Sequence, residues 1–170
     1  HSRVPFLIAA RVGGAWNSYP EYPEIRGRSK TAARNFQGFG QLIINTLISN
    51  KLGVGLVPSY LYNTDIRWGP ETGTTDIKDI FRLGTYLQYY VSPVWSLLWE
   101  WTPYISGYKS LVGQEYNPMS FGIELETGGH FFKIFLSNSQ YINASQYLAG
   151  ADIPVDRNDW RIGFMITRLL

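Results

Sequence analysis

His1 and His130 are the only histidines in this sequence, so any general-base chemistry of the serine-hydrolase type would have to use one of them. Such a site needs the histidine within hydrogen-bonding reach of a serine. Ser137 and Ser139 follow His130 too distantly, at about 3.3 Å per residue of extended chain. We therefore expect His130 to cap a hairpin turn and not to act as a base. No catalytic residue is predicted, and the protein is not expected to be an enzyme.

Glu124 and Glu126 are two residues apart and would share one face of a strand, as a carboxylate pair for acid–base work would require. Lys133, however, is expected to lie opposite Glu124 and to neutralise it. A structural charge cluster is therefore the favoured interpretation.

Three further acidic residues share one loop and could offer oxygen ligands to Ca²⁺: Asp152, Asp156 and Asp159. Their spacing is not that of an EF-hand, so a solvated acidic loop is favoured. The absence of cysteine excludes disulfides and thiolate metal sites. No metal and no cofactor is predicted.

A basic segment could bind phosphate groups, because arginine pairs well with phosphate. It comprises Arg26, Arg28, Lys30 and Arg34. Lipopolysaccharide is one expected partner, and a merely solubilising loop is the alternative. The net charge of the chain is only +2, which is not typical of a nucleic-acid-binding protein, so no nucleic-acid partner is predicted.

The elements that would carry these residues follow from an alternation of period two. Trp95, Leu97, Trp99 and Trp101 alternate with small or polar residues, which is typical of a strand with two different faces. The same pattern predicts eight strands, over residues 4–16, 38–48, 52–62, 79–91, 94–105, 117–127, 130–137 and 159–170. No apolar run approaches the roughly 18 residues of a membrane-spanning helix.

The connections between these strands alternate in length. Short turns are expected at 49–51, 92–93 and 128–129. Long loops are expected at 17–37, 63–78, 106–116 and 138–158, the last with a helical turn near 144–148. Tight periplasmic turns and longer extracellular loops are typical of outer-membrane barrels, and an even strand number leaves both chain ends on the periplasmic side. The sequence thus predicts an all-β, antiparallel up-and-down transmembrane β-barrel, as one domain over residues 1–170.

The alternation assigns side chains to the two faces of the predicted barrel. The lipid-facing and interfacial aromatic residues are expected to include Trp95, Trp99, Trp101, Phe121, Phe132, Trp160 and Phe164. The polar cluster that faces the lumen is expected to comprise Arg11, Arg82, Glu100, Glu124, Glu126, Lys133 and Arg161.

A soluble, lipocalin-like barrel with the apolar face inward is the alternative fold. Its interior would have to enclose many tryptophans and phenylalanines, which is too much volume for eight strands without a large cavity. The register predicted from the Gly128-Gly129 turn also favours the membrane barrel. It pairs Thr127 with His130 and Glu124 with Lys133, and the neighbouring hairpin is expected to bring Glu100 within diagonal reach of Arg82.

Several segments resemble a family of bacterial outer-membrane barrels, of the Bacteroidota type, that is known only as a domain of unknown function. They are residues 41–44, 58–60 with Asn63, 126–132, 136–139, 160–164 and 166–168. The resemblance implies an outer-membrane location and a barrel of about twelve strands, of which this chain would be the C-terminal part. It implies no activity.

Two functions remain open at this point. One is a structural or interaction role, in which the barrel anchors or contributes to an envelope complex through its loops or wall. The other is a small porin-like channel for ions or solutes. A closed barrel of eight strands has a lumen filled by side chains, which favours the structural role, whereas a wider barrel lined by charged residues could conduct.

Overall fold

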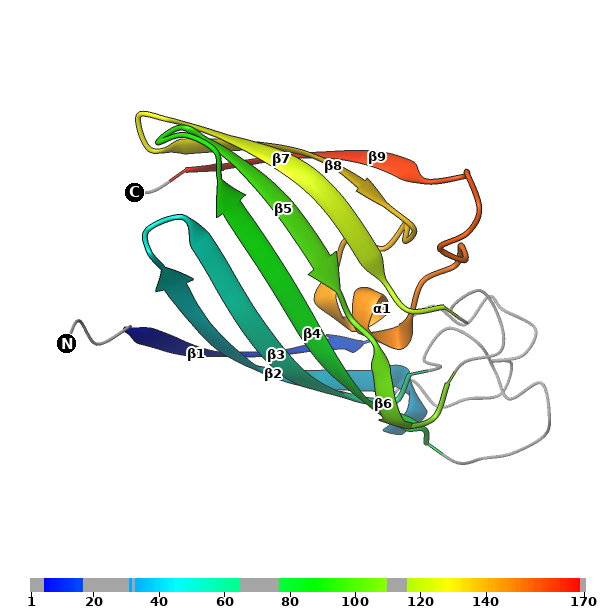
Figure 1. Cartoon of the computed structure of the whole chain (residues 1–170). Helices are drawn as coiled ribbons and strands as arrows, with labels where there is room; N and C mark the ends of the chain where they lie inside the picture. Colours follow the sequence, from blue (N-terminus) through cyan, green and yellow to red (C-terminus); the bar gives the residue numbers. More distant parts are fainter. Residues whose placement is uncertain (1–4, 17–30, 32, 65–76, 110–115, 169–170) are drawn as a thin grey trace.

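The computed structural model describes residues 5–16, 31, 33–64, 77–109 and 116–168. These residues form one nine-stranded antiparallel sheet, which is strongly curled into a half-barrel (Figure 1). The strands are β1 (Phe6–Trp16), β2 (Phe36–Ile48), β3 (Leu52–Tyr62), β4 (Asp79–Tyr90), β5 (Trp95–Trp101), β6 (Tyr104–Gly107), β7 (Met119–Thr127), β8 (His130–Ser137) and β9 (Arg161–Arg168). A 3₁₀ turn, η2 (Ala33–Asn35), precedes β2, and α1 (Ala144–Ala149) lies between β8 and β9.

Strands that follow one another in the chain are also neighbours in the sheet, in the order β1-β2-β3-β4-β5-β7-β8-β9, with β6 paired to β4. The short turns gather at one end of the sheet, and β1 begins and β9 ends at that same end (Figure 1). The up-and-down order and the antiparallel pairing predicted from the sequence are therefore confirmed.

The predicted strand boundaries agree with the structure to within about two residues, apart from one segment. The prediction of a single strand over 94–105 is wrong, because β5 ends at Trp101 and β6 begins at Tyr104. Pro103 separates them and has no N–H to donate to a ladder. Beside the break the pairing of β6 with β4 shifts register between Phe81 and Arg82, a β-bulge.

Two of the short turns use left-handed backbone. In the β2–β3 turn, Ser49 and Asn50 have φ of 51° and 53°, and the Lys51 amide donates to the carbonyl of Ile48 at 3.0 Å. Gly128 and Gly129 have φ of 54° and 83° in the β7–β8 turn. Two successive positive φ values produce the twist that tight hairpins need, and glycine adopts them without steric cost.

The convex and concave faces of the sheet differ sharply in chemistry. Large exposed apolar side chains occupy alternate positions on the convex face, among them Phe6, Leu56, Leu87, Trp95 and Phe164. Small and polar side chains occupy the concave face, where Ser59, Arg82, Ser96 and Glu124 are buried. The apolar residues therefore point outward, which contradicts the soluble alternative with an apolar interior.

Both edges of the half-barrel are open. Among the described residues, β1 is paired only with β2, and β9 only with β8. Every residue of β1 is exposed, on both of its faces. The all-β, antiparallel sheet predicted from the sequence is therefore confirmed, and it is curled into a half-barrel. No pairing between β1 and β9 closes it among the described residues.

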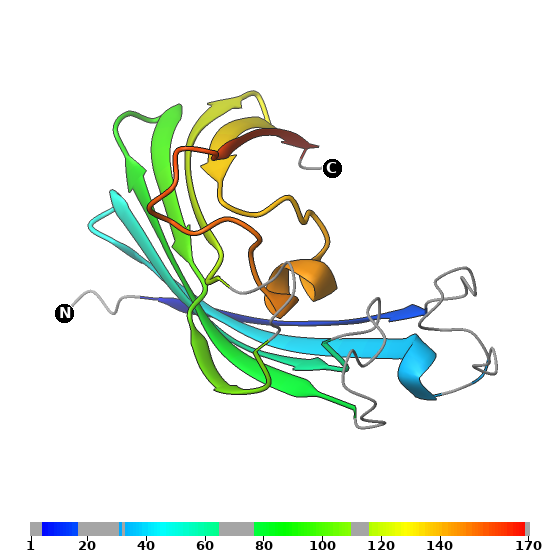
Figure 2. The same ribbon diagram turned by 90° about the vertical axis from the view of Figure 1, so that its right-hand side faces the viewer.

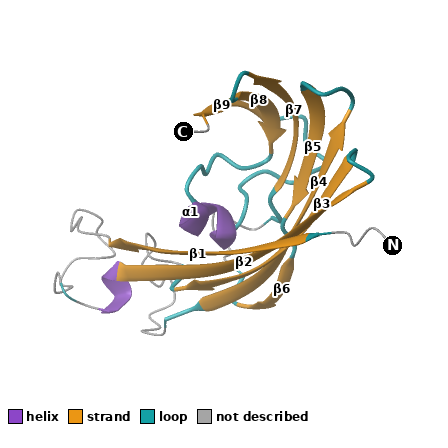
Figure 3. Cartoon of the chain, turned by 90° about the vertical axis from the view of Figure 1, so that its left-hand side faces the viewer, coloured by secondary structure: helices purple, strands orange, loops and turns teal. Residues whose placement is uncertain are grey.

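A small apolar core lies inside the curl. Leu61 and Ile80, from β3 and β4, pack against Leu148 and Ala149 of α1. Figures 2 and 3 show α1 inside the curl of the sheet. Within the part of the chain that the structure describes, no helix is long and apolar enough to cross a membrane.

Candidate functional site

The chain between β8 and β9, residues 138–160, enters the concavity of the half-barrel, and we call it the strap. It leaves the end of β8, carries α1 against the inner surface of β1 to β4, and returns to β9 (Figure 2). The helix begins after Asn143, whose side-chain oxygen accepts a hydrogen bond from the Gln146 amide at 2.9 Å. It ends at Gly150, which has a φ of 147°. The strap therefore fills part of what would be the barrel lumen.

Arg82 of β4 holds the end of α1. Its guanidinium donates from Nε to the carbonyl of Leu148 at 2.7 Å and from Nη2 to the carbonyl of Ala149 at 3.0 Å. Nη1 donates to the carbonyl of Thr102 at 3.1 Å and to Oδ1 of Asn117 at 3.2 Å. The side chain is 0% exposed. A cation at the C-terminal carbonyls of a helix is favourable, and the planar fork of arginine suits several acceptors at once.

Two asparagines connect the strap to the start of β7. Asn117 accepts from the Tyr104 amide as well as from Arg82. Asn138 is fully buried, and its side-chain amide donates to the carbonyls of Asn117 and Ile153 at 3.0 and 2.9 Å. Its Oδ1 accepts from the Met119 amide at 2.8 Å, so β7, β8 and the strap share one side chain.

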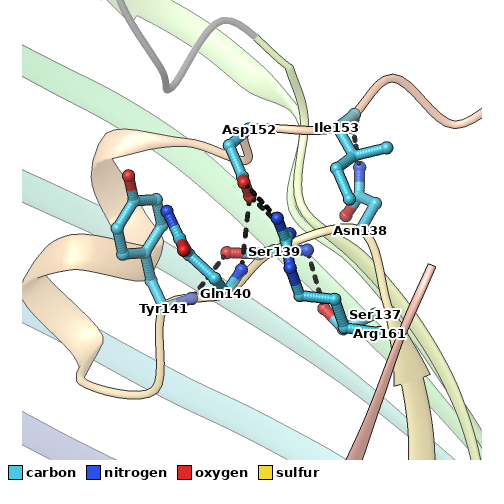
Figure 4. Close-up of polar contacts among 8 residues, drawn as sticks. All are labelled: Ser137, Asn138, Ser139, Gln140, Tyr141, Asp152, Ile153 and Arg161. Atoms are coloured by element: carbon cyan, nitrogen blue, oxygen red, sulfur yellow. Dashed lines mark hydrogen bonds and ion pairs between the residues drawn. The ribbon is translucent and has the colours of Figure 1, made fainter. Parts of the chain in front are cut away.

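An ion pair fixes the returning end of the strap to β9 (Figure 4). Arg161 donates from Nη1 and Nη2 to the two carboxylate oxygens of Asp152, at 2.9 and 2.7 Å. The backbone amide of Gln140 donates to the same carboxylate at 3.3 Å. A backbone bridge between Tyr116 and Ala151 lies beside this pair. Asp152, which the sequence offered as a Ca²⁺ ligand, thus acts as an acceptor for arginine. No group of three or more metal-ligating residues occurs among the described residues.

Tyr147 lies on α1, close to the wall. Its hydroxyl oxygen accepts from Oγ1 of Thr102 at 3.4 Å. Burial raises the pKa of the Tyr147 phenol to about 12, and the nearby Glu100 contributes in the same direction. The phenol therefore remains neutral at any physiological pH.

A second polar cluster lies nearer the short turns. Lys133 is 2.9 Å from Oε2 of Glu124, and Oε1 of that carboxylate accepts from Gln88 at 2.7 Å. Ser96 donates to the same oxygen at 3.4 Å. The predicted pairings of Glu124 with Lys133 and of Thr127 with His130 are confirmed. Glu124 is thus neutralised, as the sequence suggested.

The seven residues of the predicted lumen cluster lie on the concave face, but they do not form one cluster. Arg11 shares a row across the sheet with Gln41, Ser59 and Arg82. The expected proximity of Arg82 and Glu100 is wrong, because the register pairs Glu100 with Tyr86. Residues four apart on a strand are about 13 Å apart. Among the described residues, Glu100 accepts a long hydrogen bond from Ser120, at 3.4 Å. Glu124 pairs with Lys133, and Arg161 pairs with the strap. Glu126 lies near the end of β7, beside the short β7–β8 turn.

The predicted lipid-facing aromatic residues lie on the outer face or at its rim. Trp99 and Trp101 stack with ring centroids 6.5 Å apart, and Phe121 contacts Trp160 at 5.6 Å. Trp95 and Phe164 are exposed, and Phe132 stacks on His130 at 6.3 Å. His130 thus lies beside the hairpin turn, at the far end of β8 from Ser137. Of the predicted basic segment, Arg34 lies in η2, while Arg26, Arg28 and Lys30 lie outside the described residues.

The sequence did not reveal the contacts of the strap. The sequence predicts both the helical turn near 144–148 and the inward position of Arg82. It does not predict the contact between them, because Arg82 and Leu148 are 66 residues apart and their hydrogen bond uses a backbone carbonyl, which has no sequence signature. Asn117 and Asn138 carried no signal that distinguished them from ordinary loop residues.

The family model described as "Membrane bound beta barrel domain (DUF5777)" matches residues 1–170. No curated protein and no solved structure matches the chain. The apolar convex face, the polar concave face and the up-and-down order agree with the family description, and the predicted resemblance is confirmed. Because the family model spans the entire sequence, the chain belongs to the membrane-bound β-barrel domains of the family DUF5777.

Proposed function

We propose that this chain forms part of the wall of a β-barrel in the bacterial outer membrane. Its proposed role is structural or interactive: it anchors or contributes to an envelope complex. No catalytic step is part of the proposal. The observation that carries it is the pair of open edges at β1 and β9.

Backbone amides and carbonyls cannot remain unpaired in the hydrocarbon layer, because no water is present there to satisfy them. Each edge strand has one neighbour among the described residues. β1 and β9 run in opposite directions, so an even number of strands added between them would keep every pair antiparallel. Strands from another polypeptide segment, added at these edges, would complete the wall and join the chain to an assembly.

Self-closure between β1 and β9 is less favourable on geometric grounds. A barrel of eight strands has room only for its own side chains, whereas an α-helix with its side chains is about 10 Å in diameter. Because α1 occupies the concavity, additional strands are needed to enclose it.

Three observations support a location in the outer membrane. The short turns gather at one end of the sheet, the sequence predicts long connections between the other strand ends, and aromatic residues lie along the convex face. Lipopolysaccharide is the proposed lipid partner of the basic segment 26–34, since its phosphates suit arginine. The alternative function, a small porin-like channel, is favoured by the polar concave face but opposed by the strap, which crosses it.

Photocrosslinking at the two edges tests the proposal. A photoreactive benzoylphenylalanine replaces Phe6 in β1 or Phe164 in β9, both of which point outward. The control replaces Phe81 near the start of β4, which also points outward but is paired with β3 on one side and β6 on the other. Fractionation of the envelope on a density gradient gives the location in the same preparation.

We expect crosslinked products of higher mass from positions 6 and 164 and none from position 81, in the outer-membrane fraction. A product of twice the mass would identify a second copy as the partner. If irradiation at both edges leaves the mass unchanged, the edges are filled from within the same polypeptide, and the interaction role at the edges is rejected. Recovery in the inner membrane would reject the proposed location.

A further inference from the structure

We infer that the concave face of β1 and β2 binds one long-chain fatty acid. The site consists of Arg11, Ile43, Leu7 and Leu47, and we call these four residues the inner seam. Arg11 holds the carboxylate, and the three aliphatic side chains hold the acyl chain. The inference goes beyond the role proposed for the sheet edges and does not depend on it, because a strand added beside β1 leaves the concave face of β1 uncovered.

The inner seam is continuous across the β1–β2 hairpin. The register pairs Leu7 with Asn45 on the concave face. Ile43 and Leu47 lie two residues to either side of Asn45, so both are diagonal neighbours of Leu7. By the same register Ile43 is a diagonal neighbour of Arg11. The guanidinium therefore stands at one end of a connected row of aliphatic side chains.

The aliphatic part of the inner seam is uncovered. Leu7 is 68% exposed and Leu47 is 41% exposed, although both lie on the face of the sheet where small and polar side chains predominate. The helix α1 packs instead on Leu61 and Ile80, farther from the short turns. Gly53, the β3 partner of Leu47, has no side chain that could cover it. Contact with an apolar ligand would remove this surface from water, which is favourable.

The charge at the other end of the inner seam has no counter-ion. The guanidinium of Arg11 lies 5.5 Å from the centroid of the Phe39 ring, and neither ion pair among the described residues includes it. The described inward positions of β1 to β4 carry no carboxylate, while Arg82 adds a second positive charge to the row of Arg11. An anion is therefore favoured here. The planar fork of arginine suits a carboxylate in particular.

The dimensions of the inner seam fit one acyl chain. From Gln41, the partner of Arg11, to Leu47 the strand advances by about 20 Å. An acyl chain in one membrane leaflet spans about 15 Å, which is half of the hydrocarbon core. One cation at the end of a single apolar row matches an amphiphile with one negative charge and one chain. Such a combination of apolar lining and few polar groups is typical of ligand sites.

Equilibrium binding of radiolabelled palmitate tests the inference, on the protein extracted with its envelope partners in non-ionic detergent. Arg11→Gln removes the charge, and Arg11→Lys keeps it. Leu47→Ala shortens the aliphatic row. Its matched control is Leu56→Ala, because Leu56 is 46% exposed on the convex face. Labelled hexadecanol, which has the same chain and no charge, is measured in parallel.

We expect Arg11→Gln to raise the Kd for palmitate at least about tenfold, since hydrogen bonds between two charged groups are lost. Arg11→Lys should raise it less, because the ammonium keeps the charge without the fork. Leu47→Ala should raise the Kd about fivefold through lost apolar contact, and Leu56→Ala should leave it unchanged. The Kd for hexadecanol should not respond to Arg11→Gln. The Lys variant also carries the test if Arg11→Gln does not fold.

Three results would overturn the inference. If palmitate binding does not saturate, the chain has no such site. If the Kd is the same with and without Arg11, the carboxylate is not held by this guanidinium. Equal effects of Leu47→Ala and Leu56→Ala would mean that the acyl chain does not lie on the inner seam.

Discussion

Lys133 and Glu124 face each other across the β7–β8 hairpin, with 2.9 Å between Nζ and Oε2. The lysine is partly exposed while the carboxylate is buried, and Gln88 donates to the other carboxylate oxygen. The pair lies on the concave face, so its charges are kept away from the apolar convex surface. Because the ion pair forms only when Glu124 and Lys133 lie opposite each other, it stabilises the register of the hairpin.

Lys133→Met is expected to lower the free energy of unfolding by about 1–3 kcal/mol, because it leaves a buried carboxylate without its cation. Equilibrium unfolding in urea, in detergent micelles, measures the loss. Lys51→Met, in the exposed β2–β3 turn, is the matched control and should cause little change. The double variant Glu124→Gln/Lys133→Met should recover much of the loss. If the double variant is as unstable as the single one, the ion pair is not the cause.

Asn138→Ala is expected to cost about 3 kcal/mol, since three hydrogen bonds are lost at roughly 1 kcal/mol each. The strap should then become sensitive to proteases, because its first end is no longer fixed to β7. The neighbouring exposed Gln140 supplies the control, Gln140→Ala. Limited proteolysis followed by mass spectrometry locates the cuts. Cleavage that is equally slow in both variants would show that Asn138 does not fasten the strap.

Gly55→Ala tests the packing of the inner wall. A Cβ at Gly55 would overlap the ring of Tyr86, which is its partner across β3 and β4. The ring must therefore move, and overpacking of this kind costs about 1–3 kcal/mol. At Gly38 of β2 an added Cβ meets no atom within 4 Å, so Gly38→Ala should leave stability nearly unchanged. Thermal unfolding of both variants gives the comparison, and equal midpoints would contradict the predicted overlap.

Tyr147 gives the strap a dependence on alkaline pH. The pKa of its phenol is raised to about 12, from a usual value near 10. Because ionisation is disfavoured in the folded state, its contribution to stability is fully present below pH 10 and is lost as the pH rises through about 12. The difference in tyrosinate absorbance between the protein and Tyr147→Phe isolates this residue. A midpoint near 10 would show that Tyr147 is exposed to water.

The sequence was most informative where structure depends on local pattern. Alternation along Trp95–Trp101 and the Gly128-Gly129 turn were sufficient to predict strands, faces and the register of Glu124 with Lys133, since each depends on residues that are neighbours on one strand or one hairpin. Pro103 could have indicated the break between β5 and β6, because proline is disfavoured within a sheet. The predicted diagonal contact of Arg82 with Glu100 was wrong because the register of β4 with β5 pairs Glu100 with Tyr86, four residues along the strand from Arg82.

Contacts across the concavity could not be predicted in the same way. The acceptors of Arg82 are mainly backbone carbonyls, which every residue has, so no pattern of residue types marks them. The partners of Asn138 are likewise two carbonyls and an amide. Such bonds depend on the curvature of the whole sheet, which no single strand encodes.

The contact between β4 and α1 also sets an order for assembly. Nearly all the pairings of the wall join strands that are adjacent in the chain, so each hairpin can form as soon as its two strands are present. Arg82 and Leu148 are separated by 66 residues, and the loop between them contains β5 to β8. We therefore expect α1 to dock onto Arg82 late in folding, after the intervening strands have paired in the correct register.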